Sequence, residues 1–296
     1  MSVFSSRFEK GKLLKEVSTL GIGGPARFFV EVHTAQELQE VLLHCHTTRL
    51  PFFILGKGSN SLFDDRGFDG LVIANKIAFC DLSFPLIRVG AGYSFSLLGT
   101  QTARAGWSGL EFASGIPGSV GGAIYMNAGA NGKEVCSVIK EVTYITAQGE
   151  VVCFKNEEIS FSYRFSSFQQ KTGAIASALF ELTPSQIARQ KQLEIIDYRT
   201  KTQPYSDKSA GCIFRNPPEG SAGTLIEKSG LKGQKRGGAE VSCVHANFIV
   251  NRGGATAQDV LALASFVSHV VKEKTGVELT REVRCIPFQP GDDVSS

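Results

Sequence analysis

A glycine-rich segment, Gly109–Gly132, restricts the fold of this chain more than any other part of the sequence. It holds seven glycines in 24 residues and carries no charge after Glu111. Its uncharged part, Phe112–Gly132, is long enough to span a membrane, but Pro117, two asparagines and six glycines would leave backbone polar groups unpaired in lipid. Its bare amides can instead lie along a diphosphate while its apolar residues pack on a flat ring system. By itself, the segment is equally compatible with a structural crossover.

A second glycine loop, Leu55–Leu62, follows an expected strand. Gly56 and Gly58 can take positive φ and let an anion approach the backbone N–H groups. The loop does not fit the GxGxxG fingerprint, because Ser61 stands at the third glycine and two aspartates follow where a helix should begin. No GxxxxGK[ST] motif occurs either, and taken alone the loop is typical of a tight turn. Together, two phosphate-type loops outside both motifs indicate a flavin dinucleotide held in some other fold.

The composition narrows the class of protein and its compartment. The 31 Lys+Arg and 28 Asp+Glu leave a net charge of +3, which is too weakly basic to indicate a nucleic-acid partner. Seven cysteines form no CxxC pair and no zinc-type spacing, so we expect no metal and mostly buried, inert thiols. The N-terminus lacks the apolar stretch of a secretory leader. These features predict a cytoplasmic protein without a membrane partner.

The length of 296 residues suggests two domains or three small ones. A strand over 27–32, a helix opened by the Thr34–Glu37 capping box and a strand over 51–55 predict a βαβ unit. Short apolar runs from residue 67 to 182 predict a second, strand-rich region, with a turn at Gln148-Gly149.

Three further signals concern the C-terminal half. Thr183 and Pro184 read as the N-cap and first residue of a helix running toward Arg199. Thr256 and Asp259 form a second capping box, and Gly276 ends that helix. A closing strand is expected over 278–288.

The sequence resembles the UDP-N-acetylenolpyruvoylglucosamine reductase family. The resemblance runs in order from about residue 13 to 288, and a set of ordered motifs carries it. These motifs are Thr19–Arg27, Gly56–Asn60, Gly109–Gly132, Tyr163–Ser166, Ser209–Pro217, Gly230–Gly233, Gly237–Ser242, His245–Asn251 and Glu282-Val283. The short stretch between Arg164 and Cys212 is similar to the family's second type, which lacks an extra tyrosine loop.

The resemblance implies an α+β fold. It implies a flavin domain of the vanillyl-alcohol and p-cresol oxidase type, made of two α+β subdomains over 13–66 and 67–188. A C-terminal α+β substrate-binding domain follows over 200–288. The implied enzyme uses FAD and NADPH to reduce the enolpyruvyl ether of UDP-N-acetylglucosamine to UDP-N-acetylmuramate in cell-wall synthesis. We expect a monomer, while the sequence leaves open the oligomeric state and the preference for NADPH over NADH.

The resemblance also implies catalytic roles for three residues. Hydride passes from flavin N5 to C3 of the enolpyruvyl group, Arg164 and Glu282 stabilise the enolate, and Cys212 gives a proton to C2. The family usually has serine at position 212, but a thiol with pKa about 8.5 is a stronger acid and is still mostly protonated at neutral pH. Without the motif context, Arg164 would read as a strand ion pair and Glu282 as a solvated carboxylate.

Two further groups of residues follow from the motifs. The expected cofactor-binding residues lie in the two glycine loops and are Leu55, Gly56, Lys57, Gly58, Ser59, Asn60, Ser61, Gly115, Pro117, Gly118, Ser119, Gly121, Gly122, Asn127, Ala128 and Gly129. The expected substrate-binding residues are Tyr163, Arg199, Lys201 and Asn216. His245 is given a structural role, since no neighbouring cysteine or spacing suggests a metal.

Two other interpretations compete with this one. A related FAD-dependent oxidoreductase acting on an alcohol or sugar would share the flavin fold, but not the motifs around Cys212, His245 and Glu282. A non-catalytic nucleotide-binding module would carry the loops and lack turnover.

Overall fold

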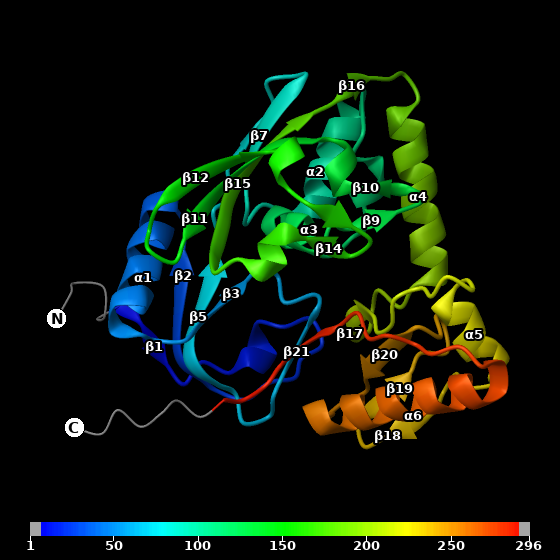
Figure 1. Cartoon of the computed structure of the whole chain (residues 1–296). Helices are drawn as coiled ribbons and strands as arrows, with labels where there is room; N and C mark the ends of the chain where they lie inside the picture. Colours follow the sequence, from blue (N-terminus) through cyan, green and yellow to red (C-terminus); the bar gives the residue numbers. More distant parts are fainter. Residues whose placement is uncertain (1–6, 290–296) are drawn as a thin grey trace, which may run out of the picture. The chain divides into compact units, whose positions relative to one another are not determined.

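The computed structural model describes residues 7–289 and divides into two compact units, each built from separate stretches of chain (Figure 1). The first unit contains the described residues up to Glu9, Phe29–Lys57 and Gly70–Arg199. The second contains Lys10–Phe28, Gly58–Asp69 and the described residues from Thr200 onward. The expected functional boundaries at 13–66, 67–188 and 200–288 stay a prediction. The N-terminal stretch that we expect to lack a secretory leader includes residues 1–6, which lie outside the described residues.

A five-stranded antiparallel sheet forms the centre of the first unit. Its order is β12 (Val151–Lys155), β11 (Ile139–Thr146), β15 (Gly173–Glu181), β7 (Leu86–Gly90) and β6 (Cys80–Asp81). β15 is central and mostly buried, in keeping with its nearly continuous apolar sequence, whereas β12 at the edge alternates exposed and half-buried residues. Gly149 takes φ 82° in the turn between β11 and β12, as expected.

The expected βαβ unit is confirmed, with one strand inserted. α1 (Ala35–Thr48) begins after Thr34, whose hydroxyl accepts a hydrogen bond from the Glu37 N–H. Its sheet has the order β1 (Glu9–Lys10), β2 (Ala26–Val32), β5 (Phe68–Asn75) and β3 (Phe52–Leu55), so β5 lies between the two strands that α1 connects. β2 and β5 begin among the residues of the second unit.

The rest of the first unit consists of short elements. The helices are α2 (Phe95–Arg104) and α3 (Val120–Tyr125), and α3 contacts β15 and β7. The strand pairs are β9 (Gly129–Ala130) with β10 (Lys133–Glu134), β13 (Phe161–Ser162) with β14 (Phe165–Ser166), and β16 (Thr183–Pro184) with β8 (Trp107–Ser108). Single 3₁₀ turns span Leu14–Glu16, Glu111–Ala113, Val135–Ser137, Asn156–Glu158 and Ser167–Gln170.

The expected helix start at Thr183 is wrong. Thr183 and Pro184 pair with Ser108 and Trp107 in β16, and α4 (Ala188–Thr202) begins four residues after the proline. The local pattern matched a cap, but strand pairing with a segment far away in the sequence decided the conformation.

A four-stranded antiparallel sheet and two helices form most of the second unit. The sheet order is β17 (Lys208–Cys212), β20 (Phe248–Asn251), β19 (Ala239–Val241) and β18 (Lys235–Arg236). Figure 1 shows α6 (Ala257–Thr275) alongside β18 and β19, which it contacts, and it also contacts α5 (Ala222–Lys228). The apolar stripe of α6 is buried against this sheet, with Val260, Leu263, Ala264, Val267 and Val271 in one core.

Two predictions at the ends of α6 are confirmed and one beyond it is not. Thr256 and Asp259 form the capping box, and Gly276 takes φ 74° at the C-terminus. The closing strand is much shorter than expected, because only β21 (Arg284–Ile286) pairs, in parallel with β4 (Ser61–Phe63).

The cysteines are more exposed than expected, and none of the seven forms a disulfide. Only Cys45 is buried; Cys80, Cys136 and Cys212 are half-buried, and Cys153, Cys243 and Cys285 are exposed. The prediction of mostly buried thiols is therefore wrong, since several of them lie on an edge strand, a loop or the last strand. Burial raises the pKa of the Cys45 thiol to about 12, which makes this one inert.

Two kinds of feature are absent from residues 7–289. None of the helices there combines the length and apolar character needed to span a bilayer. That part of the chain also gathers no group of three or more His, Cys, Asp or Glu side chains able to hold a metal ion.

The cap of α6 gives a stability prediction. Thr256→Ala removes the oxygen that accepts the Asp259 N–H at 3.0 Å, so the free energy of unfolding should fall by about 1 kcal/mol. Thr256→Ser keeps the oxygen, so its free energy of unfolding should stay within a few tenths of a kcal/mol of the native value. Urea unfolding followed by circular dichroism measures both, and equal losses in the two variants would contradict the role of the cap.

Candidate active site

The two glycine loops meet in the first unit at Gly56 and Ser119. A Cβ built on Gly56 would collide with the Ser119 hydroxyl, so a larger residue would have to displace that side chain. Ser119 is the N-cap of α3 and accepts a hydrogen bond from Gly122 N–H at 3.3 Å. Ser94 forms a β-bridge with Ser119 and accepts a hydrogen bond from Lys57 Nζ at 2.8 Å. Within the first unit, Gly56 and Lys57 of the first loop therefore lie against Ser119 and Ser94.

The amides of the first loop are available to a ligand. Within residues 7–289, the backbone N–H groups of Lys57, Gly58, Ser59 and Asn60 donate to no protein acceptor. Gly58 takes φ 64°, the left-handed conformation that turns consecutive N–H groups toward one side. The loop ends in β4, where Ser61 is largely buried, and not in the helix of a GxGxxG fold. These residues fit a diphosphate, which needs several N–H donors and no side chain in its path.

The second loop uses its amides differently. Val120 N–H donates to Tyr93 O at 2.9 Å and Gly121 N–H donates to Ala91 O at 2.8 Å, so both hold α3 in place. Gly115 N–H donates to Ser96 Oγ at 2.7 Å. These amides are therefore occupied by the protein itself, and only the other backbone groups of the loop remain for a ligand.

Asn127 and its neighbours support the loop from within. Asn127 is fully buried at φ 42°, and its side-chain amide donates to Glu134 Oε2 at 2.9 Å and to Ser162 O at 3.0 Å. Its side-chain oxygen accepts from Cys136 N–H at 3.1 Å. The expected contact of Asn127 with a cofactor stays a prediction. Leu55 is likewise buried, at the end of β3.

Arg164 stands in the two-residue turn between β13 and β14. Its φ is 58°, a conformation that costs a non-glycine residue of order 1 kcal/mol and is enriched at functional sites. Its guanidinium lies 4.8 Å from the centre of the Tyr163 ring and donates to Gly129 O at 3.3 Å. Gln169 Nε2 donates to Arg164 O at 3.1 Å, which fixes the turn. The arginine thus lies beside the end of the second glycine loop.

Cys212 and Glu282 lie on neighbouring strands of the second unit. Glu282 N–H donates to Ile213 O at 2.7 Å, and Phe214 and Arg281 form the next bridge. Glu282 is therefore opposite Ile213, directly beside the half-buried Cys212 at the end of β17. The pairing brings the backbone segments of Cys212 and Glu282 together, although the two residues are 70 positions apart in the sequence.

The second half of the first loop lies against the same strands. Asn60 Nδ2 donates to Glu282 O at 3.4 Å, and Asn60 O accepts from Arg284 N–H at 3.1 Å. A Cβ on Gly211 would lie 3.9 Å from Ser59 O. Within the second unit, the loop with the free amides thus lies against the end of β17 and the segment that contains Glu282.

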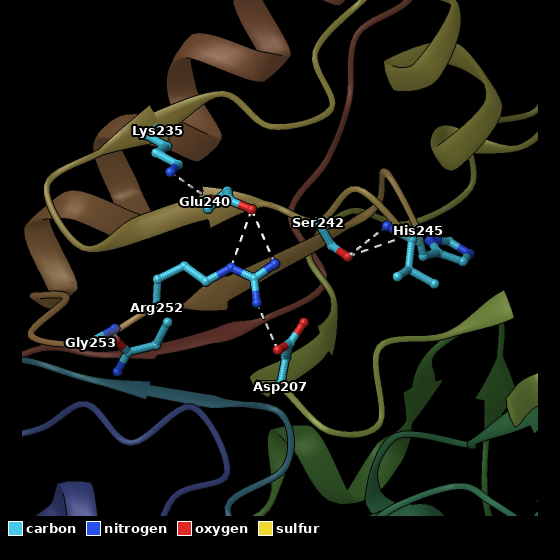
Figure 2. A network of polar contacts seen from close by, with 9 residues as sticks. Asp207, Lys235, Glu240, Ser242, His245, Arg252 and Gly253 are labelled. Atoms are coloured by element: carbon cyan, nitrogen blue, oxygen red, sulfur yellow. Dashed lines mark hydrogen bonds and ion pairs between the residues drawn. The ribbon is translucent and has the colours of Figure 1, made fainter. Parts of the chain in front are cut away.

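A charged network anchors the segment that leads into β17 (Figure 2). Arg252 donates to Glu240 at 3.1 and 3.2 Å and to Asp207 at 2.7 Å, and Lys235 lies 3.1 Å from Glu240. Burial acts to raise the pKa of Glu240, but hydrogen bonds from Arg252 and Lys235 outweigh it and hold the pKa below its ordinary value. The network ties Asp207, which precedes β17, to β19 and β20.

His245 fits the structural role expected for it. Ser242 Oγ accepts the N–H groups of Val244 and His245 (Figure 2). Nδ1 of His245 accepts the Asn247 N–H at 3.2 Å.

The expected substrate-binding residues fall in both units. Tyr163 and Arg199 belong to the first, where Tyr163 is exposed and Arg199 lies on α4. Lys201, on the last turn of α4, and Asn216 belong to the second. Asn216 Oδ1 accepts the Ala222 N–H at 3.0 Å, so it holds the start of α5. Their roles toward a substrate stay predictions.

Sequence reasoning missed Ser94, although it links Lys57 to Ser119. Ser94 precedes α2, but its side chain makes no cap hydrogen bond there. Its partner Lys57 is 37 positions away, so no local pattern could single it out.

Comparisons with known proteins cover nearly the whole chain. Residues 26–155 match the family model "FAD binding domain", and residues 203–286 match "UDP-N-acetylenolpyruvoylglucosamine reductase, C-terminal domain". The chain is 60% identical over 284 residues to the UDP-N-acetylenolpyruvoylglucosamine reductase of Protochlamydia amoebophila, covering 96% of this chain and 95% of that one. It is 48% identical to the Chlamydia pneumoniae reductase, over 94% and 91% of the two chains. The crystal structure of the Thermus caldophilus reductase is similar with TM-score 0.82 and 38% identity, over 95% and 99%.

The contact between the loops gives a second prediction. Gly56→Ala places a methyl group against the Ser119 hydroxyl, and such overpacking should lower the free energy of unfolding by about 1–3 kcal/mol and reduce bound flavin. The double variant Gly56→Ala/Ser119→Gly removes the colliding oxygen at the small expense of a glycine N-cap, and should recover most of the loss. Urea unfolding and flavin content per chain measure both variants. A double variant no better than the single one would contradict the contact.

Proposed function

Because the chain belongs to the UDP-N-acetylenolpyruvoylglucosamine reductase family, we propose that it reduces UDP-N-acetyl-3-O-(1-carboxyvinyl)glucosamine to UDP-N-acetylmuramate in peptidoglycan precursor synthesis. The chain is an oxidoreductase of α+β fold that uses FAD and NADPH. The observation that best supports the reaction is the hydrogen bond from Glu282 N–H to Ile213 O, which sets a carboxylate beside the strand that ends in Cys212.

FAD, when bound, carries hydride from NADPH to C3 of the enolpyruvyl group. The free amides from Lys57 to Asn60 would hold its diphosphate, and the expected cofactor-binding residues of the second loop would hold the rest of it. Burial, and to a lesser degree the charge of Lys76, lowers the pKa of Lys57. A bound diphosphate would offset both effects, which suits Lys57 to an anion.

Cys212 donates the proton to C2 of the substrate. A thiol is still mostly protonated at neutral pH, yet it is acidic enough to give up its proton when a carbanionic centre develops beside it. Its half-buried position leaves a face open to a ligand.

Arg164 and Glu282 act on the charge that develops at the substrate carboxylate. A fixed donor directed at such charge is typically worth about 3–4 kcal/mol. The contacts of Arg164 with Tyr163 and Gly129 restrict its guanidinium before substrate arrives, so little ordering is left to the reaction itself.

Four residues complete the proposed substrate site. Tyr163, Arg199, Lys201 and Asn216 bind the sugar nucleotide, with the two cations serving its diphosphate. We further propose that the enzyme acts in the cytoplasm as a monomer, without nucleic-acid or membrane partners.

Spectroscopy tests the function directly. The purified protein should be yellow, NADPH should bleach it in the absence of oxygen, and the enolpyruvyl sugar nucleotide should restore the colour. Recovery of colour with air alone would favour an oxidase acting on an alcohol or sugar, and a colourless protein that takes up no FAD would contradict a flavin enzyme.

The proton donor gives a third prediction. Cys212→Ala should keep flavin and its reduction by NADPH, but reoxidation by the sugar nucleotide should slow by at least about 100-fold, within the range of general acid catalysis. Cys212→Ser should keep substantial turnover, since the family's usual residue is serine. Stopped-flow absorbance of each half-reaction measures the effect. An alanine variant that reduces substrate at the native rate would mean that another group supplies the proton.

A further inference from the structure

The Thr19–Arg27 motif carries part of the family resemblance, yet no step of the proposed reaction uses it. In the structure Thr19 begins a turn within the second unit. Its backbone N–H donates to Gly58 O at 3.2 Å, and its hydroxyl donates to Ser209 O at 2.6 Å. A single residue therefore joins the loop with free amides to β17, the strand that ends in Cys212.

The turn is itself firmly held. The side-chain amide of Asn251, in β20, donates to Leu20 O at 3.0 Å and to Gly21 O at 3.4 Å. Leu20 and Ile22 are buried in the core of the second unit. Thr19 is thus attached to a part of the molecule that cannot shift without disturbing that core.

The contact with Gly58 is also sterically tight. A Cβ on Gly58 would collide with Val17 O and with the Cα of Ser18, so the loop backbone lies directly on the backbone before Thr19. Gly58 is the second of the four residues whose N–H groups have no protein acceptor within residues 7–289. Its position therefore sets where an anion held by that stretch would lie.

The contact with Ser209 lies where the pairing of β17 with β20 becomes irregular. The register of β17 with β20 shifts between Ser209 and Cys212, and Gly211 takes φ 77°. A shifted register leaves the strand less well fixed by its own hydrogen bonds. The Thr19 hydroxyl supplies an additional bond at the residue where this irregular stretch begins.

We propose that Thr19 is a positioning residue for the reduction of the sugar nucleotide. It fixes the distance between the diphosphate-holding loop and the strand of Cys212, and so the approach of the proton donor to the substrate. This role rests on the proposed function. Since small displacements of a reacting group are costly, its loss should slow the step that involves Cys212 and spare the reduction of flavin by NADPH.

The test compares two variants of the holoenzyme. Thr19→Val keeps the shape and the backbone N–H but removes the hydroxyl, whereas Thr19→Ser keeps the hydroxyl. Thr19 is exposed, so neither change should prevent folding. For Thr19→Val we expect native flavin content, NADPH reduction within about twofold of native, and reoxidation by the sugar nucleotide about tenfold slower, a difference of about 1.4 kcal/mol in barrier. Thr19→Ser should restore reoxidation to within about twofold.

A matched control is Thr48→Val. Thr48 is also exposed and its hydroxyl donates to a backbone carbonyl, His44 O, at 2.7 Å, but it lies at the end of α1. Both half-reactions should be unchanged in this variant.

The outcomes separate this proposal from the proposed function. If native protein reduced by NADPH is not reoxidised by the sugar nucleotide, the proposed function fails before any variant is measured. If the native protein turns over, then native reoxidation in Thr19→Val, equal slowing of both half-reactions, or failure of serine to restore the rate would overturn the positioning role.

Discussion

The close approach of two backbones, residues 17–25 and 58–67, underlies the rest of the second unit. A Cβ on Gly24 would collide with Asp65 O, and one on Gly67 would collide with Pro25 O. With glycine at these positions, Gly24 N–H reaches Asp64 O at 3.0 Å and Phe68 N–H reaches Pro25 O at 3.1 Å. The loop continues into β4, which pairs with β21 just after Glu282. Because these glycines lack side chains, the two backbones can pack together, and the glycine loop can continue into β4 beside β21, the strand that follows Glu282.

Local sequence signals predicted local structure well. The caps at Thr34 and Thr256 and the glycine at 276 formed as expected, because each depends on atoms within one turn of helix. The same reasoning failed at Thr183, where pairing with Trp107 and Ser108 overrode a good capping pattern. Cysteine burial also escaped prediction, because residue type gives a tendency while the position on an edge or terminal strand decides exposure.

For the candidate site, the residue types could be predicted from the sequence, whereas the way each loop uses its backbone is visible only in the structure. The two glycine loops were recognisable from composition, but their different use of backbone amides was not, since it depends on acceptors such as Ala91 and Tyr93. Asn127 was expected to meet the cofactor, whereas its side chain is occupied by Glu134, Ser162 and Cys136. The roles proposed for Arg164, Cys212 and Glu282 rest on the resemblance, because nothing local distinguishes them from ordinary surface residues.

The second unit is assembled from stretches near both ends of the described chain, and this has a consequence for biosynthesis. β4 is made early, among the first 63 residues, yet its parallel partner β21 ends at Ile286. A ribosome adding about 5–20 residues per second would leave that edge without its partner for roughly ten seconds or more. An unpaired strand edge is a site of misassociation, so the nascent chain should depend on chaperones during that interval.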